Sequence, residues 1–226
     1  MSDSLFSIDP AVNNLREYLE TLFIADDELL QSLVRETYAK TEHPRMLGDR
    51  WLCTFMEWLI VTHSVQRILE LGTFTGYTTL RLARALGDAG KITTIESSMQ
   101  HADIAEKYFV KDGRTKQINL LRGTVREQLP NLVGCDYDLV YVDADKAEYP
   151  EYLRLLEPLL HVGSIIVADN VLWGGKTCSP SVQDARTNAL RAFNQALFAD
   201  PSYKTTLLPA GDGVIVATKI TRLESV

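Results

Sequence analysis

Two short acidic segments follow apolar runs and carry residue types suited to binding a divalent cation. Asp143 follows Val142 and stands three residues before Lys146, while Asp169 and Asn170 follow the next apolar run. Two carboxylates and an amide oxygen are hard donors suited to Mg²⁺ or Ca²⁺, with water or substrate completing the shell. Each Asp alone could instead cap the helix that follows it. That explanation is less credible for all of them beside Lys146.

A glycine-rich turn lies earlier in the chain and is suited to holding a nucleoside. Gly72 and Gly76 lie within residues 70–78, between an apolar run and a helical stretch over about 78–86. Glycines there let the backbone approach a ligand beneath a helix N-terminus. Glu96 ends the next apolar run, where a carboxylate can accept hydrogen bonds from ribose hydroxyls. A tight turn and a solvated strand end would explain each feature separately, but together they indicate a nucleoside-containing ligand.

The spacing of this turn restricts the kind of nucleoside. It lacks the three-glycine pattern of dinucleotide sites, and no Lys-Ser or Lys-Thr pair follows Gly76, which excludes a Walker-type phosphate loop. Glu70 stands where it would repel a pyrophosphate. An adenosine carrying a cationic group would tolerate that acid better than NAD would.

The elements that must position these residues follow from the apolar pattern. After His63, short apolar runs alternate with amphipathic stretches, which predicts a parallel sheet with helices on both faces. Ligands bind at the carboxyl ends of the strands in such sheets, so the acidic segments and the glycine turn are expected at one edge. The last two runs are joined by a link short enough for an antiparallel hairpin. The predicted strands are residues 67–71, 91–95, 117–121, 137–142, 164–168, 203–208 and 214–220.

The chain before the first strand has a helical pattern. Apolar residues recur at helical intervals from Asn13 to about Ser64, which predicts three helices with no strand between them. Because no linker separates them from the sheet, residues 1–64 are expected to be a helical extension and not an independent domain. Residues 65–226 are expected to form the α/β domain.

Length and composition restrict the class of protein. A chain of 226 residues with 46% hydrophobic and 23% charged residues suits one large folded domain. The net charge of −7 argues weakly against bulk nucleic-acid binding. Three widely spaced cysteines suit neither a disulfide framework nor a zinc site, and no stretch approaches the ~18 apolar residues of a membrane span. A cytoplasmic protein without membrane partners is expected.

From about Met46 to Ile220 the chain resembles the catechol and caffeoyl-CoA type of class I S-adenosylmethionine-dependent O-methyltransferase. The first of four similar segments is shared by many methyltransferases, whereas the second and third are nearly diagnostic of this family. The segments are Glu70 to Thr78, Val142 to Lys146 with Tyr149, Asp169 to Gly174, and Leu207 to Pro209 with Asp212 and Gly213.

The resemblance implies a Rossmann-like fold and methyl transfer from S-adenosylmethionine to a hydroxyl of a small catechol-like or hydroxylated phenylpropanoid acceptor. It also implies a homodimer. Lys146, as general base, and Asp143 would be catalytic. Asp143, Asp169 and Asn170 would bind Mg²⁺, with Ca²⁺ or Mn²⁺ as alternatives. By position, the cofactor-binding residues would be Met46, Glu70, Gly72, Thr73, Phe74, Thr78, Glu96, Thr124, Val125, Asp143 and Asp145.

The chemistry of a phenol explains why these groups are needed together. A phenol has a pKa of about 10 and is a poor nucleophile at neutral pH. A divalent cation chelated by two vicinal oxygens lowers that pKa and orients the ring for attack on the sulfonium methyl group. Lys146 could accept the proton, which is the favoured role, or stabilise the phenolate as a cation.

Two segments depart from the family pattern. Residues 46–51 replace the usual Ser or Thr followed by Glu-Gly-Gln, which affects the cofactor contacts expected there. Gly174 replaces the Asn of the plant caffeoyl-CoA enzymes, which weakens the case for their acyl-CoA acceptor. His43, His63, His101 and His161 are scattered, show no ligand spacing and are expected to be structural or surface residues.

Three alternative functions remain open from the sequence. The first is O-methylation of a hydroxylated nucleobase in tRNA, for which Arg81, Arg84 and Lys91 could supply a local basic patch. The second is a nicotinamide-dependent oxidoreductase on the same kind of sheet. The third is a binding or scaffold protein that keeps the cofactor fold without catalysis.

Overall fold

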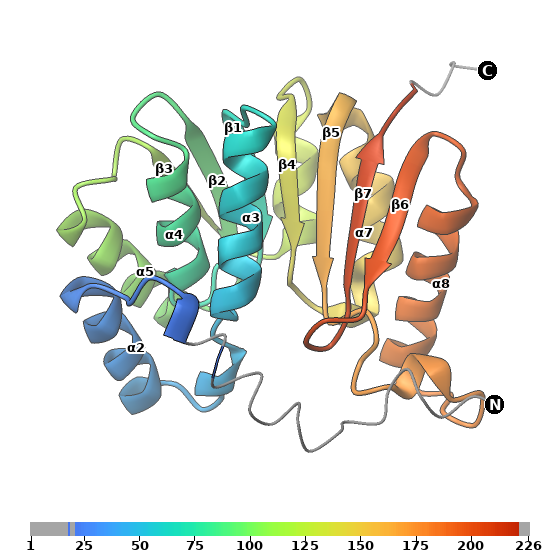
Figure 1. The fold of residues 1–226 in the computed structure, drawn as a ribbon, viewed down its shortest axis with the longest axis horizontal. Coiled ribbons are helices and arrows are strands. Elements are labelled where there is room, and N and C mark those ends of the chain that lie inside the picture. Colours follow the sequence, from blue (N-terminus) through green and yellow to red (C-terminus); the bar gives the residue numbers. More distant parts are fainter. Residues whose placement is uncertain (1–17, 19–20, 222–226) are drawn as a thin grey trace.

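The computed structural model describes residue 18 and residues 21–221. Its centre is a seven-stranded sheet in the order β3-β2-β1-β4-β5-β7-β6 (Figure 1). The strands are β1 Arg67–Leu71, β2 Lys91–Glu96, β3 Ile118–Arg122, β4 Tyr137–Val142, β5 Leu160–Asp169, β6 Tyr203–Leu208 and β7 Val214–Lys219.

The strand directions confirm the predicted mixed sheet. β1 to β5 run parallel, whereas β7 is antiparallel to both β5 and β6. The order reverses between β1 and β4, and in open α/β sheets a ligand crevice forms outside the strand ends at such a point. The predicted boundaries differ most at β5, which begins four residues before Ser164. Gly163, with φ of 99°, and a shift in the β4–β5 register interrupt the apolar pattern there.

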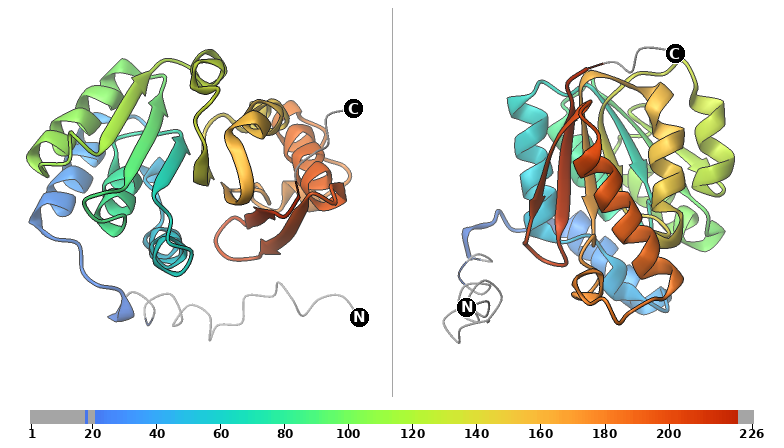
Figure 2. Two further views of the ribbon diagram at one scale, coloured as in Figure 1. Left: turned by 90° about the horizontal axis from the view of Figure 1, so that it is seen from above. Right: turned by 90° about the vertical axis from the view of Figure 1, so that its right-hand side faces the viewer.

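Helices cover both faces of this sheet, as Figure 2 shows. Helices α2 to α5 share one apolar core with the sheet, and α6 to α8 share the other. None of the described helices is long and apolar enough to cross a membrane. The helices are α2 Glu28–Lys40, α3 Arg50–Thr62, α4 Tyr77–Ala85, α5 Met99–Lys111, α6 Val125–Gln128, α7 Tyr149–Leu156 and α8 Ala185–Ala199, and the short 3₁₀ helices are η1 Pro44–Met46, η2 Leu129–Leu132, η3 Lys146–Glu148, η4 Glu157–Leu159 and η5 Lys176–Cys178.

Two of the three predicted N-terminal helices are α2 and α3, and most of the first lies outside the described residues. Leu33 of α2 and Met56 of α3 are fully buried in the core that α4 and α5 also enter. Thr37 and Thr75 hydrogen-bond through their hydroxyls at 2.8 Å, which ties α2 to the turn after β1. The division at residues 64 and 65 stays a prediction.

One edge of the sheet gathers the segments that the sequence analysis selected. The carboxyl ends of β4 and β5, the start of α3 and the turn between β6 and β7 all lie at the lower edge in Figure 1. Trp51 joins two of these segments, because a Cβ on Gly211 would lie 3.3 Å from its indole ring. The site is therefore built where several loops meet on a rigid sheet.

Candidate active site

The carboxylates of Asp143 and Asp169 converge at the ends of β4 and β5. Val142 pairs with Ala168 in the parallel register, so the next residue on each side, Asp143 after β4 and Asp169 at the end of β5, stands at the same height. The Tyr141 hydroxyl lies 3.3 Å from Asp143 Oδ2 and 3.4 Å from Asp169 Oδ2. A single hydroxyl hydrogen cannot serve both oxygens. The two Oδ2 atoms therefore share this one hydroxyl donor and retain acceptor capacity.

The electrostatics of this pair favour a cation. Asp169 is 8% exposed, and burial, followed by the nearby Asp143 charge, raises its pKa well above the usual range. Lys146 opposes that shift, while Asp49 adds to it. Two carboxylates that are costly to ionise together become less costly when a cation lies between them.

Asn170 holds an unusual backbone conformation beside the carboxylates. Its φ is 57°, and its N–H donates to Asp169 Oδ1 at 2.7 Å. Within the described residues only four non-glycine positions have positive φ, and Phe74, Asn170 and Trp173 are three of them. Such conformations cost free energy and collect at functional sites. The strain marks the glycine turn and the Asn170 turn as constrained parts of one site.

Lys146 is held rigidly between the two strand ends. Its side chain is 7% exposed, and Nζ donates to Asp143 Oδ1 at 2.5 Å and to the Tyr149 hydroxyl at 2.8 Å. The Tyr149 hydroxyl in turn lies 2.9 Å from the Val142 carbonyl and 3.1 Å from the Asp169 carbonyl, to which it can donate. Fully buried Tyr149 thus fixes the distance between Lys146 and both strand ends.

The turn from Gly72 to Gly76 leaves a hollow, called the cradle below, that larger residues at the two glycines would fill. Gly72 has φ of 101°, and a Cβ there would collide with the Asp143 carbonyl oxygen. Gly76 is the N-cap of α4 with φ of 88°, and its Cβ would press on the Phe109 ring. Both glycines are needed for the turn to pass this close to its neighbours.

Glu96 is positioned at the end of β2 by two backbone donors. The N–H of Phe74 donates to Oε2 at 2.7 Å, and that of Ser98 donates to Oε1 at 2.8 Å. Each oxygen keeps a further lone pair for a ligand hydroxyl. Thr124 and Val125 lie beside it, because the Gly123 N–H donates to the Glu96 carbonyl at 2.9 Å. Thr124 is exposed as the N-cap of α6, and Val125 is buried.

His101 belongs to this part of the site, although the sequence analysis treated it as structural or surface. Its ring stands edge-on to Phe74 with centroids 4.7 Å apart, and Nδ1 lies 3.7 Å from Glu96 Oε1. The sequence could have indicated this role, because His101 lies in the first turn of the helix that follows Glu96.

Glu70 contributes a buried carboxyl group beneath the cradle. Its side chain is fully buried, and Oε2 accepts from Thr94 Oγ1 at 2.6 Å and from Thr79 Oγ1. Its Oε1 has no hydrogen-bond partner. Burial raises the pKa of this carboxyl to about 8. A cationic group bound beside the unpartnered Oε1 would favour the ionised carboxylate and lower this pKa.

The remaining predicted cofactor residues divide into two groups. One group lines a narrow cavity and includes Met46, Thr73 and Thr78. The other is Asp145, whose carboxylate accepts from the Ala147 N–H at 3.1 Å and lies 3.7 Å from Arg186. Asp145 is therefore at the predicted strand end, with its carboxylate engaged by η3 and α8. The cavity is lined by Met46, Leu47, Gly48, Gly72, Thr73, Phe74, Tyr77, Thr78, Tyr141 and Asp143.

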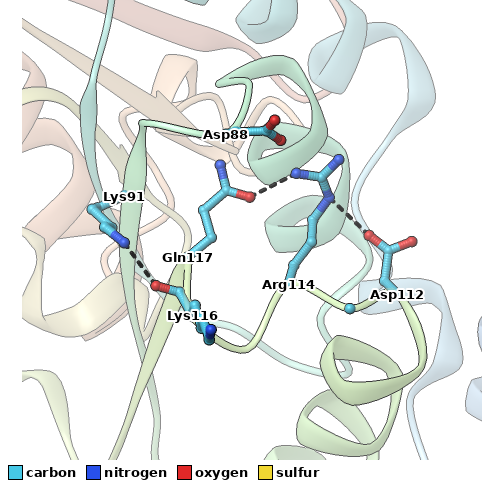
Figure 3. Close-up of a pocket in the computed structure, with 7 residues that line it drawn as sticks. Asp88, Lys91, Asp112, Arg114, Lys116 and Gln117 are labelled. Carbon is cyan, nitrogen blue, oxygen red and sulfur yellow. Dashed lines mark hydrogen bonds and ion pairs between the residues drawn. The ribbon is translucent and has the colours of Figure 1, made fainter.

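A larger hollow of about 250 Å³ lies at the opposite edge, near the start of β2 and β3 (Figure 3). Arg114 donates to Asp112 at 2.9 Å and to Gln117 at 2.7 Å, while Lys91 donates to the Lys116 carbonyl at 2.8 Å. Most of its polar groups thus bind one another. Lys91 of the suggested basic patch lines this hollow, but none of the predicted catalytic, metal or cofactor residues does, so its size does not make it the active site.

Comparison with known proteins decides the family. Residues 20–220 match the model of the O-methyltransferase family. The chain belongs to this family. This O-methyltransferase is 32% identical over 212 residues to a catechol O-methyltransferase of Niastella koreensis, covering 92% of each chain. It is 30% identical over 221 residues to caffeoyl-CoA O-methyltransferase 1 of Arabidopsis thaliana, covering 92% of this chain and 85% of the relative.

The solved structures agree with this assignment. An O-methyltransferase from Streptomyces achromogenes, solved in complex with S-adenosylmethionine, superposes with a TM-score of 0.85 at 27% identity, covering 92% of this chain and 96% of that chain. The predicted class, an S-adenosylmethionine-dependent O-methyltransferase with a Rossmann-like fold, is confirmed. Membership of this family decides against the nicotinamide-dependent oxidoreductase.

Proposed function

We propose that this O-methyltransferase methylates one hydroxyl of a small catechol-like or hydroxylated phenylpropanoid acceptor with the help of a divalent cation. The observation that carries the proposal is the convergence of Asp143, Asp169 and Lys146 beside the Gly72 turn. The names of the catechol and caffeoyl-CoA relatives support an acceptor with adjacent aromatic hydroxyls.

The cation would be held by Asp143, Asp169 and Asn170. In the part of the chain that the structure describes, no three His, Cys, Asp or Glu side chains converge as a metal site. The third protein ligand would therefore be the Asn170 amide oxygen. This oxygen-only set fits Mg²⁺, or alternatively Ca²⁺ or Mn²⁺. When bound, the cation supplies a Lewis acid that lowers the pKa of a chelated phenol from about 10.

Lys146 would accept the proton of the acceptor hydroxyl or stabilise the resulting phenolate. Nζ is fixed by Asp143 and Tyr149 at the edge where the acceptor oxygen must lie. As an amine it takes the hydroxyl proton, and as an ammonium it stabilises the phenolate. The phenolate oxygen then bonds to the methyl carbon while the carbon–sulfur bond breaks. The bonding pair stays on sulfur, which leaves as a neutral thioether.

The methyl donor would occupy the cradle between the first two strand ends. Glu96 would accept hydrogen bonds from the ribose hydroxyls, and Glu70 would face the cationic end. The other residues proposed to contact the donor are Met46, Gly72, Thr73, Phe74, Thr78, Thr124, Val125, Asp143 and Asp145.

Methyl transfer from labelled S-adenosylmethionine to caffeic acid tests the proposal. The assay is run with Mg²⁺ and again with excess EDTA, and activity that EDTA abolishes is the expected result. Activity that persists in EDTA would contradict the metal role. An inert reaction despite binding of S-adenosylhomocysteine would contradict the proposed acceptor, and transfer to tRNA would then support the nucleobase alternative.

We further propose that the enzyme acts in the cytoplasm as a homodimer. Trp58 and Val61 on α3 are 57% and 72% exposed, and Phe55 stacks on Trp58 with ring centroids 6.2 Å apart. Exposed apolar side chains of this kind suit a subunit contact. The three cysteines are unpaired, as expected in a reducing compartment. Light scattering coupled to gel filtration would measure the mass, and a monomer would contradict the dimer.

A further inference from the structure

Asp26 lies in the segment before α2, and its carboxylate contacts the starts of two other helices. The Asp26 side chain is 9% exposed. The Tyr77 hydroxyl, at the start of α4, lies 3.0 Å from Oδ2 and 3.1 Å from Oδ1 and donates its hydrogen to this carboxylate. Nη2 of Arg50, at the start of α3, donates to Oδ2 at 3.3 Å. The Asp26 carboxylate therefore joins α3 to α4 at their N-terminal ends.

These two helix starts carry two parts of the wall of the narrow cavity where the methyl donor is proposed to bind. Residues 46–48 line this cavity just before α3, and Tyr77 and Thr78 line it from α4. A Cβ on Gly48 would collide with the Thr78 hydroxyl, so the two parts of the wall are in contact. A shift of either helix start would therefore change the shape of the cavity.

Arg81 joins the same two helices one turn or more beyond their starts. Its Nε and Nη2 donate to the Glu57 carboxylate at 2.7 and 3.0 Å, and Nη2 donates to the Thr54 hydroxyl at 3.2 Å. Nη1 lies 3.9 Å from Asp26 Oδ1 and adds a second positive charge beside that carboxylate. The contacts with Glu57 and Thr54 do not involve Asp26. They should keep α3 packed on α4 when the Asp26 carboxylate is replaced.

We infer that Asp26 is a positioning residue for the methyl donor, because its carboxylate sets the relative position of the two parts of the wall. The inference rests on the proposed location of the donor in this cavity. A carboxylate that accepts from a hydroxyl and a guanidinium group makes stronger hydrogen bonds than a neutral amide would. Residues 46–51, which lack the cofactor-contacting pattern usual in the family, would thus be held in place by a contact from the segment before α2.

Calorimetry of S-adenosylhomocysteine binding tests the inference without turnover. Asp26→Asn removes the charge at nearly constant volume and should weaken binding by about tenfold, as when an outer partner of a binding site is lost. Asp27→Asn is the matched control, because it makes the same charge change one residue later and keeps a side chain that can cap α2. It loses a contact with Arg84 at 3.0 Å, outside the cavity, and should bind within about twofold of the wild type.

A double-mutant cycle tests whether Asp26 acts through the Tyr77 hydroxyl. Tyr77→Phe removes that hydroxyl, keeps the ring and should weaken binding by about three- to fivefold. The variant that carries both changes should bind about as weakly as Asp26→Asn alone, because the two changes remove one shared contact. With caffeic acid as acceptor, Asp26→Asn should raise the KM for S-adenosylmethionine by about tenfold and leave the acceptor KM within about twofold.

The outcomes separate this inference from the proposed function. Equal affinity of the wild type and Asp26→Asn would overturn the inference, as would an equal loss in Asp27→Asn or fully additive losses in the cycle. If Asp26→Asn does not fold, unchanged binding by Tyr77→Phe would still overturn it. A wild type that binds S-adenosylhomocysteine but is inert with caffeic acid would instead count against the proposed acceptor, and the binding measurements on Asp26 would still decide the inference.

Discussion

Nζ of Lys146 lies 2.5 Å from Asp143 Oδ1, and both residues follow the end of β4. This contact connects Lys146, the proposed general base, with Asp143, a proposed ligand of the cation. Replacement of Lys146 by Met should lower kcat by about 10²- to 10⁴-fold, the usual contribution of a general acid or base. Binding of S-adenosylhomocysteine, measured by calorimetry, should stay within about twofold. Lys116→Met, an exposed lysine at the opposite edge, is the control, and equal losses in both variants would contradict the role of Lys146.

Asp169 and Asn170 should control metal affinity separately from donor binding. Asp169→Ala should weaken Mn²⁺ binding by at least about tenfold, because it removes a charged oxygen donor. Electron paramagnetic resonance of free Mn²⁺ measures this directly, without turnover. Asn170→Ala should weaken Mn²⁺ binding less, because it removes a neutral donor. Loss of S-adenosylhomocysteine binding together with loss of Mn²⁺ binding would show that the residues act on the fold and not on a metal site.

Glu70 should make stability depend on pH in a defined window. Burial raises its pKa from 4.5 to about 8 in the folded protein, so the folded state retains a proton that the unfolded state loses. The resulting stabilisation is complete below pH 4.5 and is lost as pH rises to about 8, at a slope of at most ~1.4 kcal/mol per pH unit. Urea unfolding at several pH values measures the slope. Glu70→Gln should flatten it, and parallel curves for both proteins would contradict a buried neutral acid.

Gly72 should be intolerant of a side chain for two separable reasons. Its φ of 101° is unfavourable for any other residue, and a Cβ would also collide with the Asp143 carbonyl oxygen. Gly134 has a similar φ of 91° but open space around it. Gly134→Ala should therefore cost only the conformational penalty of ~1–2 kcal/mol. Gly72→Ala should cost more in urea unfolding and also weaken S-adenosylhomocysteine binding, and equal costs would rule out the collision.

Sequence patterns predicted the sheet well because burial on both faces leaves a strong signal. The apolar runs located all seven strands, and the short link before Val214 predicted the antiparallel hairpin. β5 was the main boundary error, because Gly163 and the irregular register with β4 broke the apolar run. An interruption of the apolar run looks like the end of a strand in the sequence, whereas in the structure the hydrogen bonds across the sheet continue the strand through it.

The residue types at the site could also be predicted from the sequence. Acids and glycines that occur together at strand ends are better explained by a ligand than by a separate structural role for each. The sequence by itself determined the reaction class, through its likeness to the O-methyltransferase family, and which strand ends carry the acids and glycines. Only the tertiary structure placed His101 against Phe74 and Glu96, and Tyr141 between two carboxylates. It also decided that Asp49 is the N-cap of α3 but makes no side-chain capping hydrogen bond. These relationships join residues far apart in the sequence, and only packing of the helices on the sheet brings them within reach of one another.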